Sequence, residues 1–179
     1  MRTLVLGGIR SGKSRWAEAA IAETLAPDQP VRFLATGQTA CADPAWRQRI
    51  AEHRDRRPPH WSTVETDDIA TQLRHSGATP TIVDDIGGWL TATLDRRRAA
   101  EGGSVSADVD DLLTAVAEFC SPLVLVSPEV GLAVVPATES GRRFADELGM
   151  LNQRLAVLCD QVVLVVAGHP VAIKPSGIR

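Results

Sequence analysis

The chain has 179 residues, of which 44% are hydrophobic and 23% charged, and its formal net charge at pH 7 is −3. These values are ordinary for a soluble globular protein and exclude a disordered or fibrous chain. The length predicts one domain over residues 1–179, large enough to cover both faces of a sheet. A net negative charge argues against a basic surface that would bind nucleic acid.

Cysteine spacing and the length of the apolar runs bear on whether the chain is cytoplasmic, exported or inserted in a membrane. Cys41, Cys120 and Cys159 lie far apart and form no CxxC pair, so we expect reduced thiols rather than disulfides or a zinc site. The apolar stretch at residues 3–6 is too short for a signal peptide, and no uncharged apolar run approaches the ~18 residues that span a bilayer. We therefore expect a cytoplasmic protein without membrane insertion.

Short runs rich in Val, Leu and Ile predict buried strands at residues 3–8, 31–37, 81–85, 122–127 and 161–168. Longer stretches between them predict helices at 13–25, 44–57, 67–75, 88–98, 108–119 and 140–159, the last with Gly149 as a point where it could break. Apolar strands alternating with helices indicate an α/β fold, a doubly wound, mostly parallel sheet in a three-layer domain. The Gly/Ser-rich segment 101–106 is too short to divide domains.

The segment after the first predicted strand has the pattern GxxxxGKS. It consists of Gly7, Gly8, Ile9, Arg10, Ser11, Gly12, Lys13 and Ser14. An apolar strand precedes it and a helix follows, which is the context in which this pattern grips the phosphates of ATP or GTP. Its backbone N–H groups and the helix N-terminus attract phosphate oxygens, Lys13 reaches the outer phosphates, and Ser14 can ligate Mg²⁺.

Two acidic residues, Asp84 and Asp85, end the third predicted strand. A P-loop site needs an acidic residue at the end of a neighbouring strand to hold the magnesium shell, and either residue can supply it. Capping of the following helix is the alternative for both. The sequence thus predicts Ser14, Asp84 and Asp85 as the metal-binding residues.

Arginines surround His53 in the segment RQRIAEHRDRRPPH at residues 47–60. Trp46, Ile50 and His53 share a helical face, so the histidine would point inward. Two interpretations stay open from these residues alone. The segment is a solvated basic helix with a half-buried histidine, or His53 is a nucleophile that attacks a nucleotide α-phosphate while arginines neutralise the phosphates.

Several segments carry a resemblance that covers nearly the whole chain. They are LGGIRSGKSRWAE at 6–18, FLATG at 33–37, RIAEHRDRRPPHWSTVE at 49–65, EVGLAVVP at 129–136 and NQRLAVLCDQVVLVVAGHP at 152–170. With them in this order, the chain resembles the bifunctional adenosylcobinamide kinase / adenosylcobinamide-phosphate guanylyltransferase family of cobalamin biosynthesis. The resemblance implies a P-loop, RecA-like fold and a two-step enzyme. Such an enzyme phosphorylates adenosylcobinamide with a nucleoside triphosphate and then transfers GMP from GTP to adenosylcobinamide phosphate through a GMP-histidine.

The resemblance also implies roles for particular residues. The family motif RIxxHRxxRPxxW places the guanylylated histidine at His53, with Lys13 as the second catalytic residue. Nucleotide contacts beyond the phosphate loop are implied at Ala35, Thr36, Gly37, Arg57, Pro58, Pro59, His60, Glu65 and Asp84. The Glu65 carboxylate could accept hydrogen bonds from guanine and so favour GTP, although simple surface solvation explains it equally well.

The family further implies GTP, ATP and Mg²⁺ as ligands, adenosylcobinamide and its phosphate as substrates, and a homo-oligomer, a trimer with the corrinoid site where subunits meet. This chain departs from the family pattern at Ala45, Trp46 and Pro128, and at Asp85 where the family has cysteine. These departures bear on the kinase step and on corrinoid contacts. Glu129 is a further candidate polar group at the same sheet edge, with capping as its alternative.

Two other functions are compatible with the phosphate loop. The first is a monofunctional P-loop small-molecule kinase in which His53 is structural. The second is a catalytically silent module that senses nucleotides by binding them.

Overall fold

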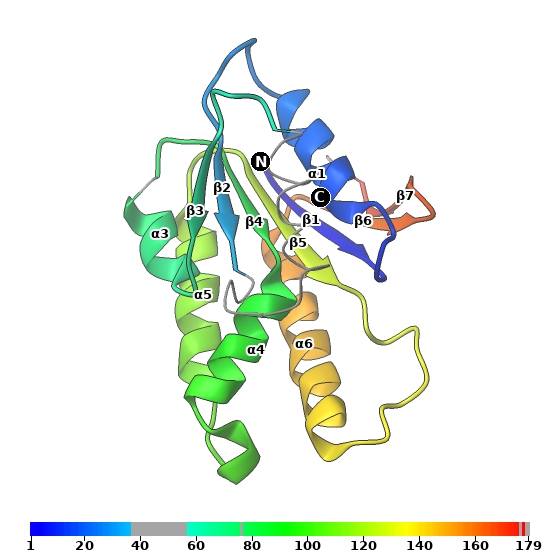
Figure 1. The fold of residues 1–179 in the computed structure, drawn as a ribbon. Helices are drawn as coiled ribbons and strands as arrows, with labels where there is room; N and C mark the ends of the chain where they lie inside the picture. The colour runs from blue at the N-terminus through cyan, green and yellow to red at the C-terminus, as the bar shows by residue number, and fades with distance from the viewer. Residues whose placement is uncertain (37–56, 76, 176, 178–179) are drawn as a thin grey trace.

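The computed structural model describes residues 1–36, 57–75, 77–175 and 177 (Figure 1). Of the helix predicted at 44–57, residues 44–56, which include the candidate nucleophile His53, lie outside the described residues, as does Gly37. Arg57, which the sequence places at the end of that helix, lies in a bend that leads into an extended segment.

The described strands form one seven-stranded sheet with the order β3-β2-β4-β5-β1-β6-β7. All neighbouring strands pair in parallel except β6 and β7, which are antiparallel. This order places β5 between β1, which leads into the phosphate loop, and β4, which ends at Asp84. The strands are β1 (Arg2–Gly7), β2 (Arg32–Ala35), β3 (Ser62–Glu65), β4 (Thr81–Asp84), β5 (Leu123–Pro128), β6 (Gln161–Val166) and β7 (His169–Lys174).

Helices cover both faces of the sheet (Figure 1). Side chains of α3, α4, α5 and α6 pack on one face, and α1 packs on the other. The bounds are α1 (Lys13–Ala22), α3 (Ile69–His75), α4 (Ile86–Arg96), the short 3₁₀ helix η1 (Ala99–Glu101), α5 (Ser106–Glu118) and α6 (Glu139–Leu158). α6 continues through Gly149, because one glycine in a long helix costs only about 1 kcal/mol.

The core consists of two apolar clusters, one on each side of the sheet. Successive side chains of a strand point to opposite faces, so the neighbours Leu4 and Val5, both fully buried, enter different clusters. Strands buried on both faces need apolar residues at every position, which explains the continuous apolar runs in the sequence. The predicted α/β, doubly wound, mostly parallel architecture is confirmed.

The sequence analysis missed two strands, both at the edges of the sheet. β3 has the sequence STVE and exposes three of its four residues, so it lacks the apolar run that marks a buried strand. β7 is exposed over most of its length and contains Pro170, which is tolerated only because the strand is an edge. A two-residue turn joins it to β6, with Ala167 and Gly168 both at positive φ, as tight hairpins require.

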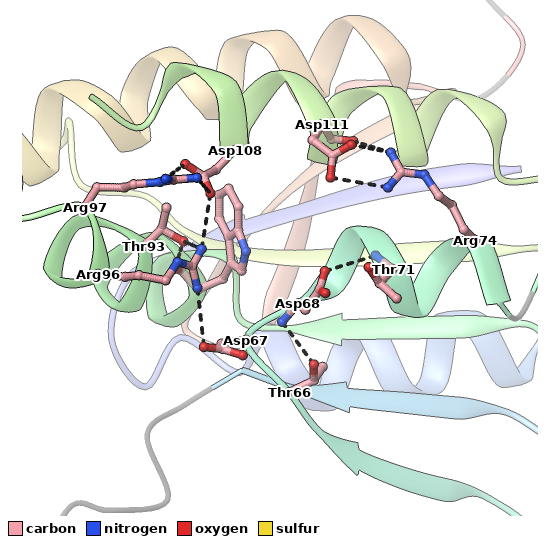
Figure 2. Close-up of polar contacts among 11 residues, drawn as sticks. Thr66, Asp67, Asp68, Thr71, Arg74, Thr93, Arg96, Arg97, Asp108 and Asp111 are labelled. Atoms are coloured by element: carbon pink, nitrogen blue, oxygen red, sulfur yellow. Dashed lines mark hydrogen bonds and ion pairs between the residues drawn. The ribbon is translucent and has the colours of Figure 1, made fainter. Parts of the chain in front are cut away.

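Ion pairs fasten α4 to the start of α5 (Figure 2). Arg97 donates to both carboxylate oxygens of Asp108 at 2.8 and 3.0 Å, and Arg96 adds a third contact at 3.3 Å. The Asp108 side chain is only 12% exposed. The hydrogen bond from Arg97, helped by the charges of both arginines, lowers the pKa of Asp108 below its ordinary value.

Replacing Asp108 by Asn should therefore destabilise the fold at neutral pH by about 1 kcal/mol, since the pair is partly exposed and solvent weakens it. A lowered folded-state pKa means that the carboxylate stabilises the protein fully above its ordinary pKa of 3.8, and that this contribution is lost as the pH falls below that value. Urea unfolding at pH 7 and at pH 3 measures the difference.

The matched control is Asp110→Asn, which removes a pair with Arg154 in which both side chains are more than half exposed. We expect almost no change for that variant at either pH. An Asp108→Asn penalty that is the same at pH 7 and pH 3 would contradict the assignment.

Candidate nucleotide-binding site

The loop between β1 and α1 has a backbone that needs glycine at defined positions. A Cβ on Gly7 would lie 2.5 Å from the Ser11 hydroxyl oxygen and 2.8 Å from the Val165 carbonyl oxygen, so no side chain fits there. Gly12, immediately before α1, has φ +94°, which side chains rarely adopt. Arg10 is also at positive φ, at 56°. The chain is thus bent into a tight cradle ahead of the helix.

The interior of this cradle fits an anion. Ser11 is buried, and within the described part of the chain its hydroxyl has no hydrogen-bond partner. Buried polar atoms are nearly always paired, so an orphaned hydroxyl in a phosphate-loop motif fits a phosphate oxygen as its missing partner. The Lys13 ammonium lies 3.5 Å from the Gly8 carbonyl oxygen and so reaches back across the loop. Gly8, Ile9 and Arg10 are exposed.

The turn between β6 and β7 supports the cradle from outside. The Gly168 N–H donates to the Ser11 carbonyl oxygen at 2.8 Å. A Cβ on Gly12 would lie 3.2 Å from the Gly168 Cα, so the two backbones are in close contact. The hairpin that the sequence did not reveal therefore fixes the central residues of the phosphate loop.

A carboxylate from β4 reaches the start of α1. The Ser14 hydroxyl lies close enough to Asp84 for hydrogen bonding to favour the charged carboxylate, and the charges of Lys13 and Arg57 act in the same direction. Burial, with a smaller contribution from Asp85, nevertheless raises the pKa of Asp84 to about 6. The predicted residues Ser14, Lys13, Arg57 and Asp84 are thus brought together.

This arrangement suits Mg²⁺ bound with a nucleotide. Mg²⁺ is held by one or two protein oxygens, several waters and substrate phosphates rather than by a cage of side chains. Accordingly, the described residues contain no cluster of three or more His, Cys, Asp or Glu that could hold a metal alone. Ser14 and Asp84 are the oxygen donors that meet beside the phosphate loop.

Asp85 has a different environment from Asp84. Its side chain accepts a hydrogen bond from the Gly88 N–H and caps α4, and its carbonyl oxygen accepts one from the Thr36 hydroxyl. The Thr36 N–H in turn donates to the Asp84 carbonyl oxygen at 3.1 Å. Ala35 pairs with Asp84 across the two strands, so the predicted residues Ala35 and Thr36 adjoin the acidic pair. Helix capping was the alternative role for both aspartates. The contact that the Asp85 side chain makes is such a cap, on α4.

Arg57 is held against the α1 face of the sheet. Its guanidinium carbon lies 3.2 Å from the centre of the Phe33 ring, its Nε lies 3.4 Å from a Glu18 carboxylate oxygen, and its side chain is 8% exposed. Nη1 also donates to the Thr63 hydroxyl at 3.0 Å. Arg57 is thus a buried cation with fixed partners, and its charge also acts on Asp84.

The remaining predicted residues lie farther out. Pro58 and Pro59 are exposed, and His60 is half-buried with Nδ1 3.9 Å from an Asp28 carboxylate oxygen. Glu65 is exposed at the end of β3, separated from β1 by β2, β4 and β5. No described contact joins Glu65 to the phosphate loop.

Sequence reasoning missed the buried polar residues that support this edge of the sheet. The Ser127 hydroxyl donates to the Asn152 side-chain oxygen at 2.6 Å, and the Asn152 amide donates to the Pro128 carbonyl oxygen at 3.1 Å. Both Ser127 and Asn152 are buried. The sequence did offer a signal for this pair. Asn152 stands at an inward-facing position of an amphipathic helix, and a buried amide needs polar partners.

The cradle and the strand order define a P-loop nucleotide-binding protein of the α/β class. Solved structures of secretion ATPases share the fold. EscN from the type III secretion system of enteropathogenic Escherichia coli matches with a TM-score of 0.55 and 13% identity, covering 93% of this chain and 43% of that one. A prototypical type III secretion ATPase of pathogenic bacteria matches with a TM-score of 0.54 and 16% identity. The match covers 91% of this chain and 50% of that one. At these identities the likeness concerns the fold alone.

Sequence comparison identifies the family. The chain belongs to the cobinamide kinase / cobinamide phosphate guanyltransferase family, whose model matches residues 3–173. It is 41% identical to the bifunctional adenosylcobalamin biosynthesis protein CobP of Pseudomonas aeruginosa, over 97% of this chain and 98% of that protein. It is 35% identical to the bifunctional adenosylcobalamin biosynthesis protein CobU of Escherichia coli K12, over 97% of this chain and all of that one.

Gly7→Ala should abolish tight nucleotide binding, because the added Cβ would collide with Ser11 and with the Val165 carbonyl and force the cradle open. We expect the Kd for a fluorescent GTP analogue to rise at least about 100-fold, the loss of roughly 3 kcal/mol of binding free energy. Fluorescence titration in the presence of Mg²⁺ measures it.

Gly149→Ala is the control, since a Cβ there meets nothing within 4 Å and alanine favours the helix. That variant should bind like the wild type and melt slightly higher. Unchanged binding by Gly7→Ala would show that the described cradle is not the nucleotide site.

Proposed function

We propose that this chain phosphorylates adenosylcobinamide with a nucleoside triphosphate and then transfers GMP from GTP to the resulting phosphate, giving adenosylcobinamide-GDP and pyrophosphate. The observation that carries the proposal is the tight cradle after β1 in a chain of this family, with the Asp84 carboxylate near Ser14, Lys13 and Arg57. In a member of this family, that arrangement is the phosphate-handling half of a transferase site.

The residues of the cradle account for phosphate binding. Loop N–H groups and the N-terminus of α1 face the phosphates, Lys13 neutralises the outer ones, and Arg57 supplies a second, pre-positioned cation. Ser14 and Asp84 would hold Mg²⁺, which supplies charge neutralisation to the phosphates when bound. Catalysis of phosphoryl transfer then depends mainly on positioning and electrostatics, with ATP and GTP as donors.

For the second reaction we propose His53 as the covalent carrier. An imidazole nitrogen attacks the α-phosphorus of GTP, the bond to the bridging oxygen breaks, and pyrophosphate leaves with that electron pair. A phosphate oxygen of adenosylcobinamide phosphate then attacks the same phosphorus and releases the histidine. The support for His53 is the motif RIAEHRDRRPPHW, in which Arg57 follows four residues later and lies in the described site.

Base recognition and metal ligation extend the proposal. Glu65, an exposed carboxylate, would accept hydrogen bonds from guanine at the end of β3, with Ala35, Thr36, Gly37 and residues 58–60 completing the nucleotide contacts. Asp85 as a third metal-binding residue stays a prediction, and its capping of α4 makes Asp84 the better candidate.

Covalent guanylylation has a direct test. Incubation with α-labelled GTP and Mg²⁺ should leave about one label per chain, stable in base and labile in acid as a phosphoramidate is, and His53→Ala should abolish it. His75→Ala, at the end of α3, is the matched control and should label normally.

The two alternative functions, a monofunctional kinase and a nucleotide sensor, give different results in the same experiment. Phosphorylation of adenosylcobinamide without protein labelling would indicate a monofunctional kinase with a structural His53. Tight GTP binding with neither product, even with cobinamide phosphate present, would indicate a nucleotide sensor.

We also propose a cytoplasmic homo-oligomer. None of the helices in the described part of the chain is both long and apolar enough to cross a bilayer. Large aliphatic side chains are exposed on the edge strand β7, at Val171 (50%) and Ile173 (58%), and in the loop after β5, at Leu132 (81%) and Val134 (92%).

Light scattering coupled to gel filtration should therefore give a mass of about three chains, the state that the family resemblance implies. If β7 is part of the interface, Val171→Lys together with Ile173→Lys should lower the measured mass, since lysines on an edge strand oppose its pairing with another chain. A wild-type mass of a single chain at micromolar concentration would refute the oligomer.

A further inference from the structure

The end of β5 lies between the two elements of the phosphate site. In the sheet, Pro128 is level with Gly7 of β1 on one side, and Val126 is level with Asp84 of β4 on the other. Neighbouring strands lie about 4.8 Å apart, so each flank is one strand spacing away. Because Ser14 and Asp84 lie near one another across this gap, a nucleotide bound in the phosphate loop would have its outer phosphate near the end of β5.

Glu129 is the first residue beyond that end. Its N–H donates to the Gly7 carbonyl oxygen at 3.1 Å, which ties its backbone directly to the first residue of the phosphate loop. One carboxylate oxygen accepts a hydrogen bond from the Gly131 N–H at 2.6 Å. The residue is half-buried, so its carboxylate is held in place and still accessible to a substrate.

Three elements fix the position from which Glu129 emerges. Asn152 of α6 holds the Pro128 carbonyl oxygen and the Ser127 hydroxyl. The Pro128 ring packs on Gly87 at the start of α4, where a Cβ would come within 2.6 Å of the ring. The phosphate loop holds the Glu129 N–H. A group anchored by α6, α4 and the loop has the preorganisation that a catalytic side chain needs.

The other carboxylates that the structure describes at this edge are engaged or distant. Asp84 adjoins the Ser14 hydroxyl, and Asp85 caps α4. Glu65 lies on β3, two strands beyond β4. Among these carboxylates, Glu129 is thus the one whose backbone is bonded to the phosphate loop and whose side chain neither adjoins Ser14 nor caps α4.

We infer that Glu129 is the general base of the kinase step, an inference that rests on the proposed function. Its carboxylate accepts the proton of the adenosylcobinamide hydroxyl as the hydroxyl oxygen forms a bond to the γ-phosphorus of the nucleoside triphosphate. The bond from that phosphorus to the β,γ-bridging oxygen breaks, and the nucleoside diphosphate leaves with the electron pair. Guanylyl transfer through histidine does not need this proton transfer.

Glu129→Gln tests the inference, because glutamine keeps the shape and the acceptor for the Gly131 N–H and loses only the basic oxygen. We expect kcat for phosphorylation of adenosylcobinamide, with ATP and with GTP, to fall by at least about 100-fold. The KM for each nucleotide, the melting temperature and labelling by α-labelled GTP should stay close to wild type. Glu129→Ala should show the same loss of kcat.

Glu139→Gln, an exposed glutamate at the other end of the same loop, is the control and should retain full activity. A nearly normal Glu129→Gln beside a defective Glu129→Ala would show that the side chain only accepts the Gly131 N–H, and would overturn the inference. So would a joint loss of phosphorylation, labelling and stability. A wild-type chain that labels with GMP but has no kinase activity would overturn the kinase half of the proposed function as well.

Discussion

The placement of the Ser14 hydroxyl near the Asp84 carboxylate is the constraint on which the rest of the site depends. It brings the N-terminus of α1 close to the carboxyl end of β4, although β5 lies between β4 and the strand that feeds α1. β4 ends level with Val126 and Val5, two residues before Pro128 and Gly7, so the register of the three strands sets where Asp84 lies relative to the phosphate loop. The parallel register, the two-sided core and the caps of the helices therefore serve one requirement, a serine hydroxyl and a carboxylate side by side at the edge of the sheet.

Holding a carboxylate there has an energetic cost that the surroundings partly offset. Burial and the neighbouring Asp85 both disfavour the charged form of Asp84, while Ser14, Lys13 and Arg57 favour it. A bound divalent cation would favour the charged form of Asp84, since its charge of +2 attracts the carboxylate. The charged carboxylate therefore costs more free energy without a bound cation than with one, which is typical of a site shaped for binding rather than for stability.

Much of this could be predicted from the sequence because the signals are local. The phosphate loop depends on eight consecutive residues, and the continuous apolar runs follow from burial on both faces, so both were found. β3 and β7 were missed because edge strands need no apolar run. The Gly168–Ser11 contact and the Ser127–Asn152 pair join residues far apart in the chain, and no spacing rule links such positions. The separate roles of Asp84 and Asp85 depend on which way each side chain points, and composition does not encode that. The prediction of one domain over residues 1–179 and the role of His53 stay predictions.

The support that the β6–β7 turn gives the phosphate loop has a consequence for how the protein is made. The loop is synthesised well before its partner Gly168, because the two lie far apart in the chain. β1 itself lies between β5 and β6, both from the C-terminal third of the chain. The nascent chain must therefore keep a glycine-rich segment and an apolar strand unpaired until β5 and β6 have been made. The phosphate loop can therefore take its described shape only once the β6–β7 turn is in place beside it.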